Sequence, residues 1–446
     1  MKRAASPKRG SLSPPPVKRK IESTTTSKAV SSFFKPASQK EPEKLVWKIL
    51  DQSLIVGRYT DPSQPPRPLE HPVRIAAFDL DDALIKPKAG GARFVRNVTS
   101  HIWWDAVVPG RLKELYLSGY LMVILTNQGS ISLRDNAKSL QKDTLSLKNF
   151  KDQLTSFLRQ LDFPISVYAA TGNDKYRKPR VGMWEQIREE HHLDDDGTID
   201  MDNSFYVGDA AGREKTDMRQ KDHATSDRDL AANIGIKFQT PEEFFLGLET
   251  EPYLHPFEPK QFLESALSRP QEKAPFTKQN KQELVIFCGS PGAGKSSFYW
   301  KVLQPQAYER VNQDILKTRD KCIKAARQFL EDGKSVVVDN TNRDQDARSH
   351  WTRVARDFSI PIRCILFTAS ARLCEHNDVV RAHNSSMNPE SRMILPPIAF
   401  RSFAQSYVQP SIDEGFQDIT TVHFEFEGTD AERKIWSKYW VSKFST

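Results

Sequence analysis

The sequence predicts two α/β domains with parallel sheets, and three observations support this fold class. The chain has 446 residues, 38% of them hydrophobic, which suits two domains of roughly 150–200 residues better than one core. Short apolar segments alternate with amphipathic ones, as strands and helices do in parallel sheets. A Pro-, Lys- and Gln-rich stretch at 251–282 breaks this pattern and predicts a linker. We therefore expect a tail at 1–43 and folded domains at 44–250 and 283–446.

The first 43 residues are expected to form a disordered basic tail. Their Ser, Pro, Thr and Lys composition cannot bury enough apolar area to offset the entropy of ordering. Residues 1–40 carry ten Lys or Arg against one acid, Glu22, which gives this segment a net charge of +9. Because the whole chain has a net charge of +8, the remaining residues together carry −1. The tail, and not the folded part, is therefore the basic element.

Two features of the tail suggest localisation and partners. Lys8-Arg9 and Lys18-Arg19-Lys20 resemble a nuclear import signal, with a merely solubilising tail as the alternative. The segment 30–34 ends in Phe33-Phe34 and resembles a degenerate sliding-clamp-binding motif that lacks its usual Gln. Exposed aromatic residues in a tail can also be incidental. We expect a nuclear protein that contacts a sliding clamp or repair scaffold through this tail.

Composition also excludes several classes of protein. No run of about 18 apolar residues occurs, and the N-terminus lacks the apolar region of a secretory signal. We expect a soluble, intracellular monomer that does not bind membranes. The cysteines show no zinc-finger spacing and are expected to be reduced thiols in the core. They are Cys288, Cys322, Cys364 and Cys374.

The first domain contains four polar motifs. Three of them lie at or just after the ends of predicted strands, and the fourth, at Lys178, lies between two of these strands in the sequence. The strands are expected at 74–78, 121–125, 165–169 and 205–207, with a helix at 149–161. The motif residues are Asp79 and Asp81, Thr126, Lys178, and Asp209. Because the carboxyl ends of parallel strands share one edge, we expect these side chains to meet there.

The chemistry of this set is that of phosphate removal. Asp79 can attack phosphorus and form an aspartyl phosphate, while Asp81 acts first as acid and then as base. Thr126 and Lys178 can hold phosphoryl oxygens. Asp79, Asp209 and the Asp81 carbonyl supply the oxygen ligands that Mg²⁺ prefers. An Asp-x-Asp pair alone would more often be two solvated acids, but four motifs in order make that interpretation weak.

The arrangement resembles the haloacid-dehalogenase-type phosphatases. The strings Tyr176-Arg177-Lys178-Pro179, Gly182-Met183-Trp184 and Tyr206 to Arg213 resemble the phosphatase half of the eukaryotic polynucleotide kinase 3′-phosphatase family. The resemblance implies Mg²⁺ ligation by Asp209, a supporting role for Asp227, and an order of phosphatase before kinase. It covers the chain from about Trp47 onward, and we expect no forkhead-associated domain. The family motif Asp-Gly-Thr is replaced by Asp81-Asp82-Ala83, which predicts a slower phosphatase.

The second domain opens with a phosphate-binding loop. A predicted strand at 284–288 leads into a match to G-x-x-x-x-G-K-[ST], followed by a helix. A second apolar strand is predicted at 336–338 and ends in Asp339. Backbone N–H groups of such a loop wrap a polyphosphate, Lys295 reaches the β and γ phosphates, and the Ser296 hydroxyl can ligate Mg²⁺. We expect ATP to be bound by Gly289, Gly292, Ala293, Gly294, Lys295, Ser296 and Ser297.

Residues beyond the loop favour a kinase over a motor or GTPase. Asp314 can serve as base for an acceptor hydroxyl, although it could instead cap a helix. Arg381 can clamp phosphate from a helical stretch, although a lone Arg there is more often a solvated charge. The strings Val311 to Asp314, Asp339 to Asn342 and Glu375-His376-Asn377 resemble the kinase half of the same family. That resemblance implies that Asp314 activates the 5′ hydroxyl and that Arg381 is the lid arginine.

The sequence therefore predicts a DNA end-processing enzyme for strand-break repair that removes 3′ phosphates and phosphorylates 5′ hydroxyls with Mg²⁺ and ATP. RNA end healing is the first alternative, since only the 2′-OH distinguishes the substrates. The nuclear-type tail and the lack of a ligase or cyclic phosphodiesterase region favour DNA. A repair scaffold with an active kinase and a dead phosphatase is the second alternative, and a fused metabolite kinase and phosphatase is the third.

Overall fold

The computed structural model describes residues 44–60, 68–88, 99–133, 140–217, 219–267 and 276–444. The chain divides into a unit from Met1 to Lys44 and a unit from Leu45 to Thr446. The tail's predicted disorder, its import signal and Phe33-Phe34 lie outside the described residues. The fold therefore concerns the second unit, which contains two large sheets.

The first sheet has seven strands. In spatial order they are β1 (Leu45–Leu50), β2 (Leu54–Tyr59), β7 (Ile165–Ala170), β6 (Leu121–Asn127), β3 (Ile75–Phe78), β8 (Phe205–Val207) and β9 (Lys237–Gln239). The strands from β7 to β9 are parallel, with Ile75 opposite Leu121 and Ala76 opposite Phe205. The predicted parallel sheet forms, and an antiparallel β1–β2 hairpin, which the sequence pattern did not predict, extends it. A separate two-stranded sheet pairs β4 (Ile85–Pro87) with β5 (His101–Trp103).

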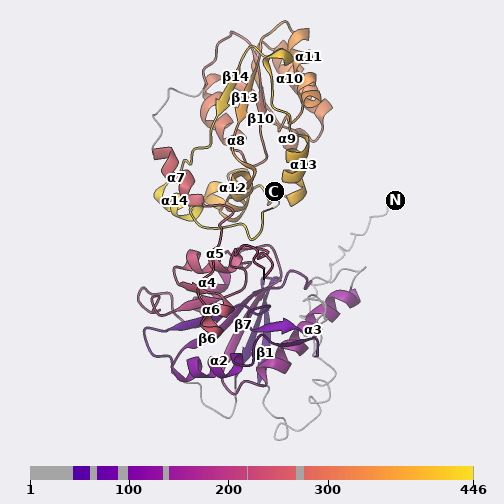
Figure 1. The fold of residues 1–446 in the computed structure, drawn as a ribbon. Helices are drawn as coiled ribbons and strands as arrows, with labels where there is room; N and C mark the ends of the chain where they lie inside the picture. Colours follow the sequence, from indigo (N-terminus) through magenta and orange to yellow (C-terminus); the bar gives the residue numbers. More distant parts are fainter. Residues whose placement is uncertain are drawn as a thin grey trace, which may run out of the picture. The chain divides into compact units, whose positions relative to one another are not determined.

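Helices cover both faces of the first sheet (Figure 1). Because successive strand residues point to opposite faces, Phe78 and Ile124 belong to one core cluster and Ala77 and Val123 to the other. The helices are α2 (Val108–Leu117) and α3 (Leu140–Leu158) on the first face, α4 (Gly182–Glu190) and α5 (Ser226–Ile234) on the second, and α6 (Pro241–Leu246), which packs through its phenylalanines against the first cluster. The chain order reverses direction across the sheet at β3, and ligands bind at such switch points.

The second large sheet has five parallel strands. In spatial order they are β11 (Tyr308–Val311), β12 (Ser335–Val338), β10 (Leu284–Cys288), β13 (Ile362–Phe367) and β14 (Ile419–Val422). The predicted strands at 284–288 and 336–338 are confirmed by β10 and β12. The three central strands, β12, β10 and β13, are uninterrupted or nearly uninterrupted apolar runs, as expected where both faces of a parallel sheet are covered.

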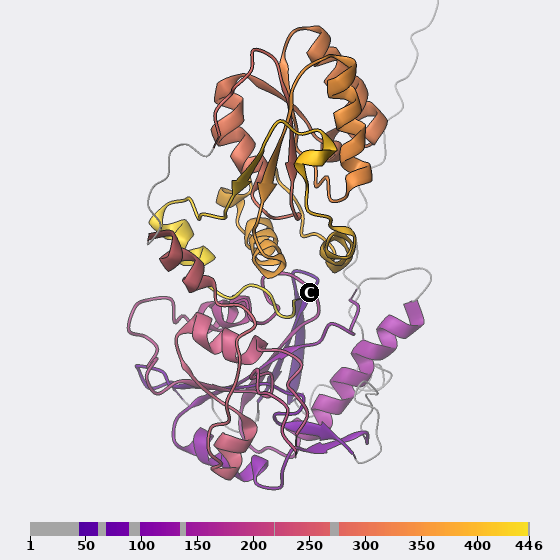
Figure 2. The ribbon, with the colours of Figure 1, turned by 45° about the horizontal axis from the view of Figure 1, so that its top comes forward.

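Helices cover both faces of this sheet as well (Figure 2). One face packs on α10 (Arg319–Glu331) and α11 (Gln345–Asp357) through Ala326 and Trp351. The other packs on α12 (Ala371–His383) and α13 (Pro397–Ser406) through Cys374 and Phe400. The remaining elements are α8 (Lys295–Phe298), the π-helix η2 (Tyr299–Leu303), α9 (Gln313–Leu316), the 3₁₀ helices η3 (Gln304–Gln306), η4 (Ser385–Met387) and η5 (Ile412–Glu414), and α14 (Asp430–Trp436).

The segment predicted to be a linker, 251–282, contains a helix, α7 (Pro259–Leu267). Near it, Phe257 and Leu263 join a small cluster with Val380 and Trp436, so part of this segment packs on the second half of the chain. All four cysteines are free and buried, as predicted. Within the described residues, no helix is both long and apolar enough to cross a membrane.

Two candidate active sites

The first candidate site lies at the carboxyl ends of β3, β6 and β8, as the sequence predicts. Asp79 directly follows β3, and Thr126 is the second-last residue of β6. Asp209 is separated from the end of β8 by one residue. A backbone hydrogen bond from Asp79 N to the Val207 carbonyl, 2.8 Å long, continues the β3–β8 pairing into the site. Parallel pairing therefore places motifs 130 residues apart in the chain (79 to 209) at one sheet edge.

A lysine sits between two carboxylates at this edge. The Lys178 ammonium lies 2.7 Å from Asp79 Oδ1 and 2.8 Å from Asp227 Oδ1, and it also donates to the Tyr206 hydroxyl. The side chains of Lys178 and Asp227 are only 2% and 1% exposed. Although burial opposes its charge, Asp227 and Asp79 raise the pKa of Lys178, so the ammonium form persists.

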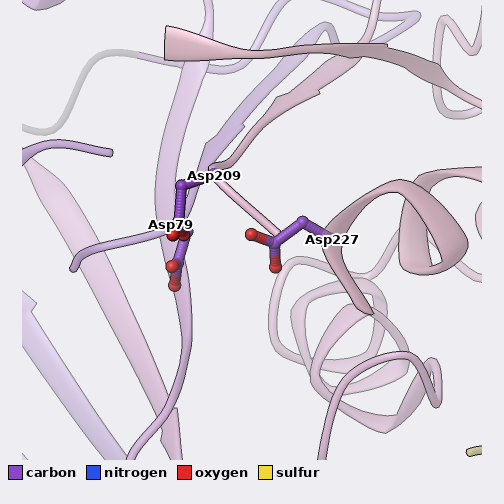
Figure 3. A group of neighbouring side chains, drawn as sticks. All are labelled: Asp79, Asp209 and Asp227. Carbon is purple, nitrogen blue, oxygen red and sulfur yellow. The ribbon is translucent and has the colours of Figure 1, made fainter. Parts of the chain in front are cut away.

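Three carboxylates gather around this lysine. Oxygen atoms of Asp79, Asp209 and Asp227 lie within 4.8 Å of one another. Figure 3 shows the Asp79 and Asp209 carboxylates together and that of Asp227 turned toward them from α5. Burial, opposed by Lys178 and assisted by the neighbouring carboxylates, raises the pKa of Asp79 to about 7. Burial and the charges of Asp227 and Asp79 likewise raise the pKa of Asp209.

This donor set fits a divalent cation. Three carboxylates face one ammonium, which leaves excess negative charge, and hard cations such as Mg²⁺ take oxygen ligands. Asp227, predicted only as a supporting acid, is a full member of the group. Its position depends on Gly208, because a Cβ there would lie 2.4 Å from Asp227 Oδ2. The same carboxylate oxygen accepts a hydrogen bond from Ala210 N at 3.0 Å.

The predicted acid and base, Asp81, lies beside this group and is held by a glutamine. Gln128 Nε2 donates to Asp81 Oδ2 at 2.8 Å and to Thr126 Oγ1 at 2.9 Å. Asn127 exchanges hydrogen bonds with the backbone of Lys178 and so orients the lysine. In the sequence, Tyr206 is recognisable only as part of a motif string, and no spacing rule identifies Gln128 or Tyr206 as a support for the site.

The second candidate site surrounds the loop after β10. Gly292 has a φ of +78°, and a Cβ there would lie 2.2 Å from the Cys374 carbonyl oxygen, so this loop needs glycine. The helix α8 begins at Lys295, as expected for a phosphate-binding loop. The Lys295 ammonium donates to the carbonyls of Gly289 and Ser290, and burial lowers its pKa. All seven predicted ATP-binding residues lie in or beside this loop.

An acidic residue at the end of the neighbouring strand β12 contacts the phosphate-binding loop. Asp339 directly follows β12, and its Oδ2 accepts a hydrogen bond from Ser296 Oγ at 2.8 Å and one from Arg310 Nε at 2.8 Å. Ser296 and Asp339 thus form an oxygen pair that suits Mg²⁺ beside a nucleotide. In the sequence, Asp339 stands out only within the family string Asp339 to Asn342. An apolar strand that ends in Asp was the available signal.

The predicted base Asp314 is open to an extended cavity. It lies in the first turn of α9, whose N-cap is Asn312, so the alternative that Asp314 itself caps the helix is wrong. The Asp314 side chain is 77% exposed. It lines a cavity of about 2980 Å³ together with Ser296, Arg381 and Arg392. Arg381, the predicted lid residue, lies on α12 and forms an ion pair with Asp378.

Comparison with known proteins identifies a phosphatase half and a kinase half in this chain. Residues 74–245 match the family model described as polynucleotide kinase 3 phosphatase, and residues 284–410 match an AAA domain model. A bifunctional polynucleotide phosphatase/kinase of Schizosaccharomyces pombe is 39% identical over 86% of this chain and 85% of its own length. A putative bifunctional polynucleotide phosphatase/kinase of Acanthamoeba polyphaga mimivirus is 33% identical over 84% of this chain and 90% of its own length. A polynucleotide 3′-phosphatase of Saccharomyces cerevisiae is 28% identical and matches only 40% of this chain, over 90% of its own length. The chain belongs to the family of bifunctional polynucleotide phosphatase/kinases.

Proposed function

We propose that this enzyme repairs DNA strand breaks by converting 3′-phosphate and 5′-hydroxyl ends into ends that a ligase can join. The observation that carries this proposal is the presence in one chain of two different phosphate sites: the buried Asp79, Lys178 and Asp227 group, and the open loop with Ser296 and Asp314. The first suits hydrolysis of a phosphate monoester and the second suits transfer from ATP.

The phosphatase reaction proceeds in two steps. An Asp79 oxygen attacks phosphorus, the bond between phosphorus and the 3′ oxygen breaks, and Asp81 gives its proton to that oxygen. Asp81 then takes a proton from water, whose oxygen bonds to phosphorus while the bond from phosphorus to the Asp79 oxygen breaks, so that inorganic phosphate leaves and the Asp79 carboxylate is regenerated. Lys178 and Thr126 hold the phosphoryl oxygens throughout. Mg²⁺, held by Asp79, Asp209 and Asp227 with the Asp81 carbonyl, would neutralise charge on the phosphoryl group.

The kinase reaction uses the second site. Asp314 takes the proton of the 5′ hydroxyl, whose oxygen bonds to the γ phosphorus of ATP while the bond from that phosphorus to the β–γ bridging oxygen breaks. Lys295 and the loop N–H groups hold the phosphates, and Arg381 of α12 lines the same cavity. Ser296 with Asp339 would hold the Mg²⁺ that accompanies ATP.

The DNA assignment rests on the tail and not on the catalytic chemistry. Its +9 charge and import-like clusters favour a nuclear enzyme. A nuclear location in turn favours contact between Phe33-Phe34 and a sliding clamp or repair scaffold. RNA end healing remains the alternative substrate assignment, because both sites act on groups that RNA shares.

A nicked duplex tests the proposal directly. The full-length protein receives duplexes that carry a 3′ phosphate and a 5′ hydroxyl at the nick, with Mg²⁺ and ATP, and both ends are followed by gel analysis. We expect both ends to be converted. We also expect conversion at the DNA nick to be faster than conversion at the same nick in an RNA duplex. A higher kcat/KM on RNA at both ends would support the RNA alternative. A 3′ phosphate that persists while the 5′ end is phosphorylated would support the scaffold with a dead phosphatase.

A further inference from the structure

The segment between α12 and α13 brings a second arginine into the kinase site. Arg392 Nη2 donates to Ser296 Oγ at 3.1 Å, and Arg392 Nη1 lies 3.6 Å from Asp314 Oδ2. Ser296 marks the side of the phosphate donor, because it follows Lys295 in the loop. Asp314 marks the side of the acceptor hydroxyl. The Arg392 guanidinium therefore spans the path that a transferred phosphoryl group must take.

Arg381 occupies a different position, although the family resemblance selects it. Its guanidinium pairs with Asp378, whose side chain is almost completely buried, and burial lowers the pKa of Arg381. The second oxygen of Asp378 accepts a hydrogen bond from Leu395 N at 2.8 Å. The Arg381 and Asp378 pair therefore anchors the end of the segment that carries Arg392.

A glutamate holds Arg392 toward the site. Glu390 accepts hydrogen bonds from Arg392 Nε at 2.7 Å, from Arg310 Nη1 at 2.8 Å and from Trp300 Nε1 at 3.0 Å. Although burial opposes its ionisation, hydrogen bonds from Arg310 and Trp300 lower the pKa of Glu390 to about 2, so the carboxylate is ionised at neutral pH. Since Arg310 also pairs with Asp339, a continuous set of ion pairs runs from Asp339 to Arg392.

We propose that Arg392 is a catalytic residue of the kinase reaction, which contacts the transferred phosphoryl group between Ser296 and Asp314, and that Glu390 is its positioning residue. This inference rests on the proposed 5′-kinase function. Negative charge spreads over the phosphoryl oxygens as the bond to the acceptor oxygen forms and the bond to the β–γ bridging oxygen breaks. A guanidinium offers planar, paired donors to such oxygens, and it is already placed before the reaction begins.

Steady-state kinetics of Arg392 variants test this assignment. With the full-length protein, a 5′-hydroxyl oligonucleotide and γ-labelled ATP, Arg392→Ala should lower kcat about 100- to 1000-fold, the usual effect of removing one transition-state donor. The KM for ATP should change less than about fivefold, because the loop and Lys295 still bind the donor. Arg392→Lys should recover part of kcat, and guanidinium ion added to Arg392→Ala should recover more.

The controls separate this inference from the proposed function and from misfolding. Arg401→Ala removes an exposed arginine of α13 and should leave kcat unchanged. The 3′-phosphatase rate and the melting temperature should stay at wild-type values in every variant. Glu390→Gln should lower kcat about tenfold with KM unchanged, as expected when positioning is lost but the arginine remains. Wild-type kcat in Arg392→Ala, with an active wild-type enzyme, would overturn the inference alone. Absence of 5′ phosphorylation by the wild-type enzyme would overturn the proposed function as well.

Discussion

The two proposed active sites differ in how their charged groups are placed. In the phosphatase site Lys178 and Asp227 are 2% and 1% exposed and are packed between strands and α5. In the kinase site Asp314 is 77% exposed, and Arg392 reaches it from an irregular segment across a cavity. The first site is preorganised by the protein core, whereas the second is assembled from separate elements around its substrates. Substitutions in the first should therefore affect folding and catalysis together, and those in the second should affect mainly turnover.

The largest expected effect is complete separation of the two reactions. Lys295→Ala and Asp314→Ala should each lower 5′ phosphorylation by at least about 1000-fold, because they remove the proposed phosphate contact and the proposed base, and should leave 3′ dephosphorylation intact. Asp79→Asn should do the reverse, since an amide cannot form the aspartyl phosphate. Both activities are measured on matched oligonucleotides. If any one of these three substitutions silences both reactions in a cooperatively melting protein, the two-site description is wrong.

A buried ion pair of the kinase half, which lies away from the open site, should control stability. Arg348 is fully buried, binds both oxygens of Glu414, and donates to the carbonyls of Asn342 and Val408. Arg348→Ala leaves that carboxylate unpaired and should destabilise this half by about 3–5 kcal/mol, measured by urea denaturation. Arg327→Ala breaks an exposed pair with Asp357 and should cost less than about 1 kcal/mol. Equal losses in the two variants would contradict the role of burial.

Asp227 tests whether the phosphatase site depends on its third carboxylate. Asp227→Asn keeps the side-chain volume but removes a charge from the group of Asp79 and Asp209, so the Mg²⁺ concentration for half-maximal phosphatase activity should rise about 10- to 100-fold. Chelation of the metal should abolish wild-type phosphatase activity. The exposed Asp196→Asn is the matched control and should match the wild-type metal dependence. An unchanged Mg²⁺ dependence in Asp227→Asn would remove Asp227 from the metal site.

The smallest expected effect concerns the departure from the family motif at Asp82-Ala83. Asp82 has a φ of +56°, which glycine adopts more easily, and its charge contributes to the raised pKa of Asp209 after burial, Asp227 and Asp79. Asp82→Gly should therefore raise phosphatase kcat about three- to tenfold, equivalent to about 1 kcal/mol in the barrier, and leave kinase kcat alone.

Restoring the family residue at Ala83 should have the opposite effect to restoring it at Asp82. Because this residue is fully buried, Ala83→Thr adds atoms to a packed region and should cost about 1–3 kcal/mol of stability. Restoring the whole family motif should thus give less benefit than Asp82→Gly alone, as measured by phosphatase kcat and melting temperature in the single and double variants. An increase in kcat only in the double variant would reverse this ranking.

Much of the fold and of both sites could be predicted from local patterns. Apolar runs predicted β3, β6, β7, β8, β10 and β12 nearly to the residue, because buried parallel strands are uninterrupted apolar segments. The phosphate-binding loop and the acids after β3 and β8 were predictable because their chemistry needs particular residues at short spacing. Parallel strand order then implied that Asp79, Thr126 and Asp209 meet at one edge, and the structure places them there.

Other features were decided only by the tertiary structure. The β1–β2 hairpin pairs with β7 more than 100 residues later (54 to 170), and no local pattern determines such a distant partner. Gln128, Tyr206, Glu390 and Arg392 make contacts between segments far apart in the chain, and their residue types are common on any surface. A short motif reports the chemistry of its own backbone segment. The side chains that support or complete a site depend on how the strands and helices pack, so only the folded chain identifies them.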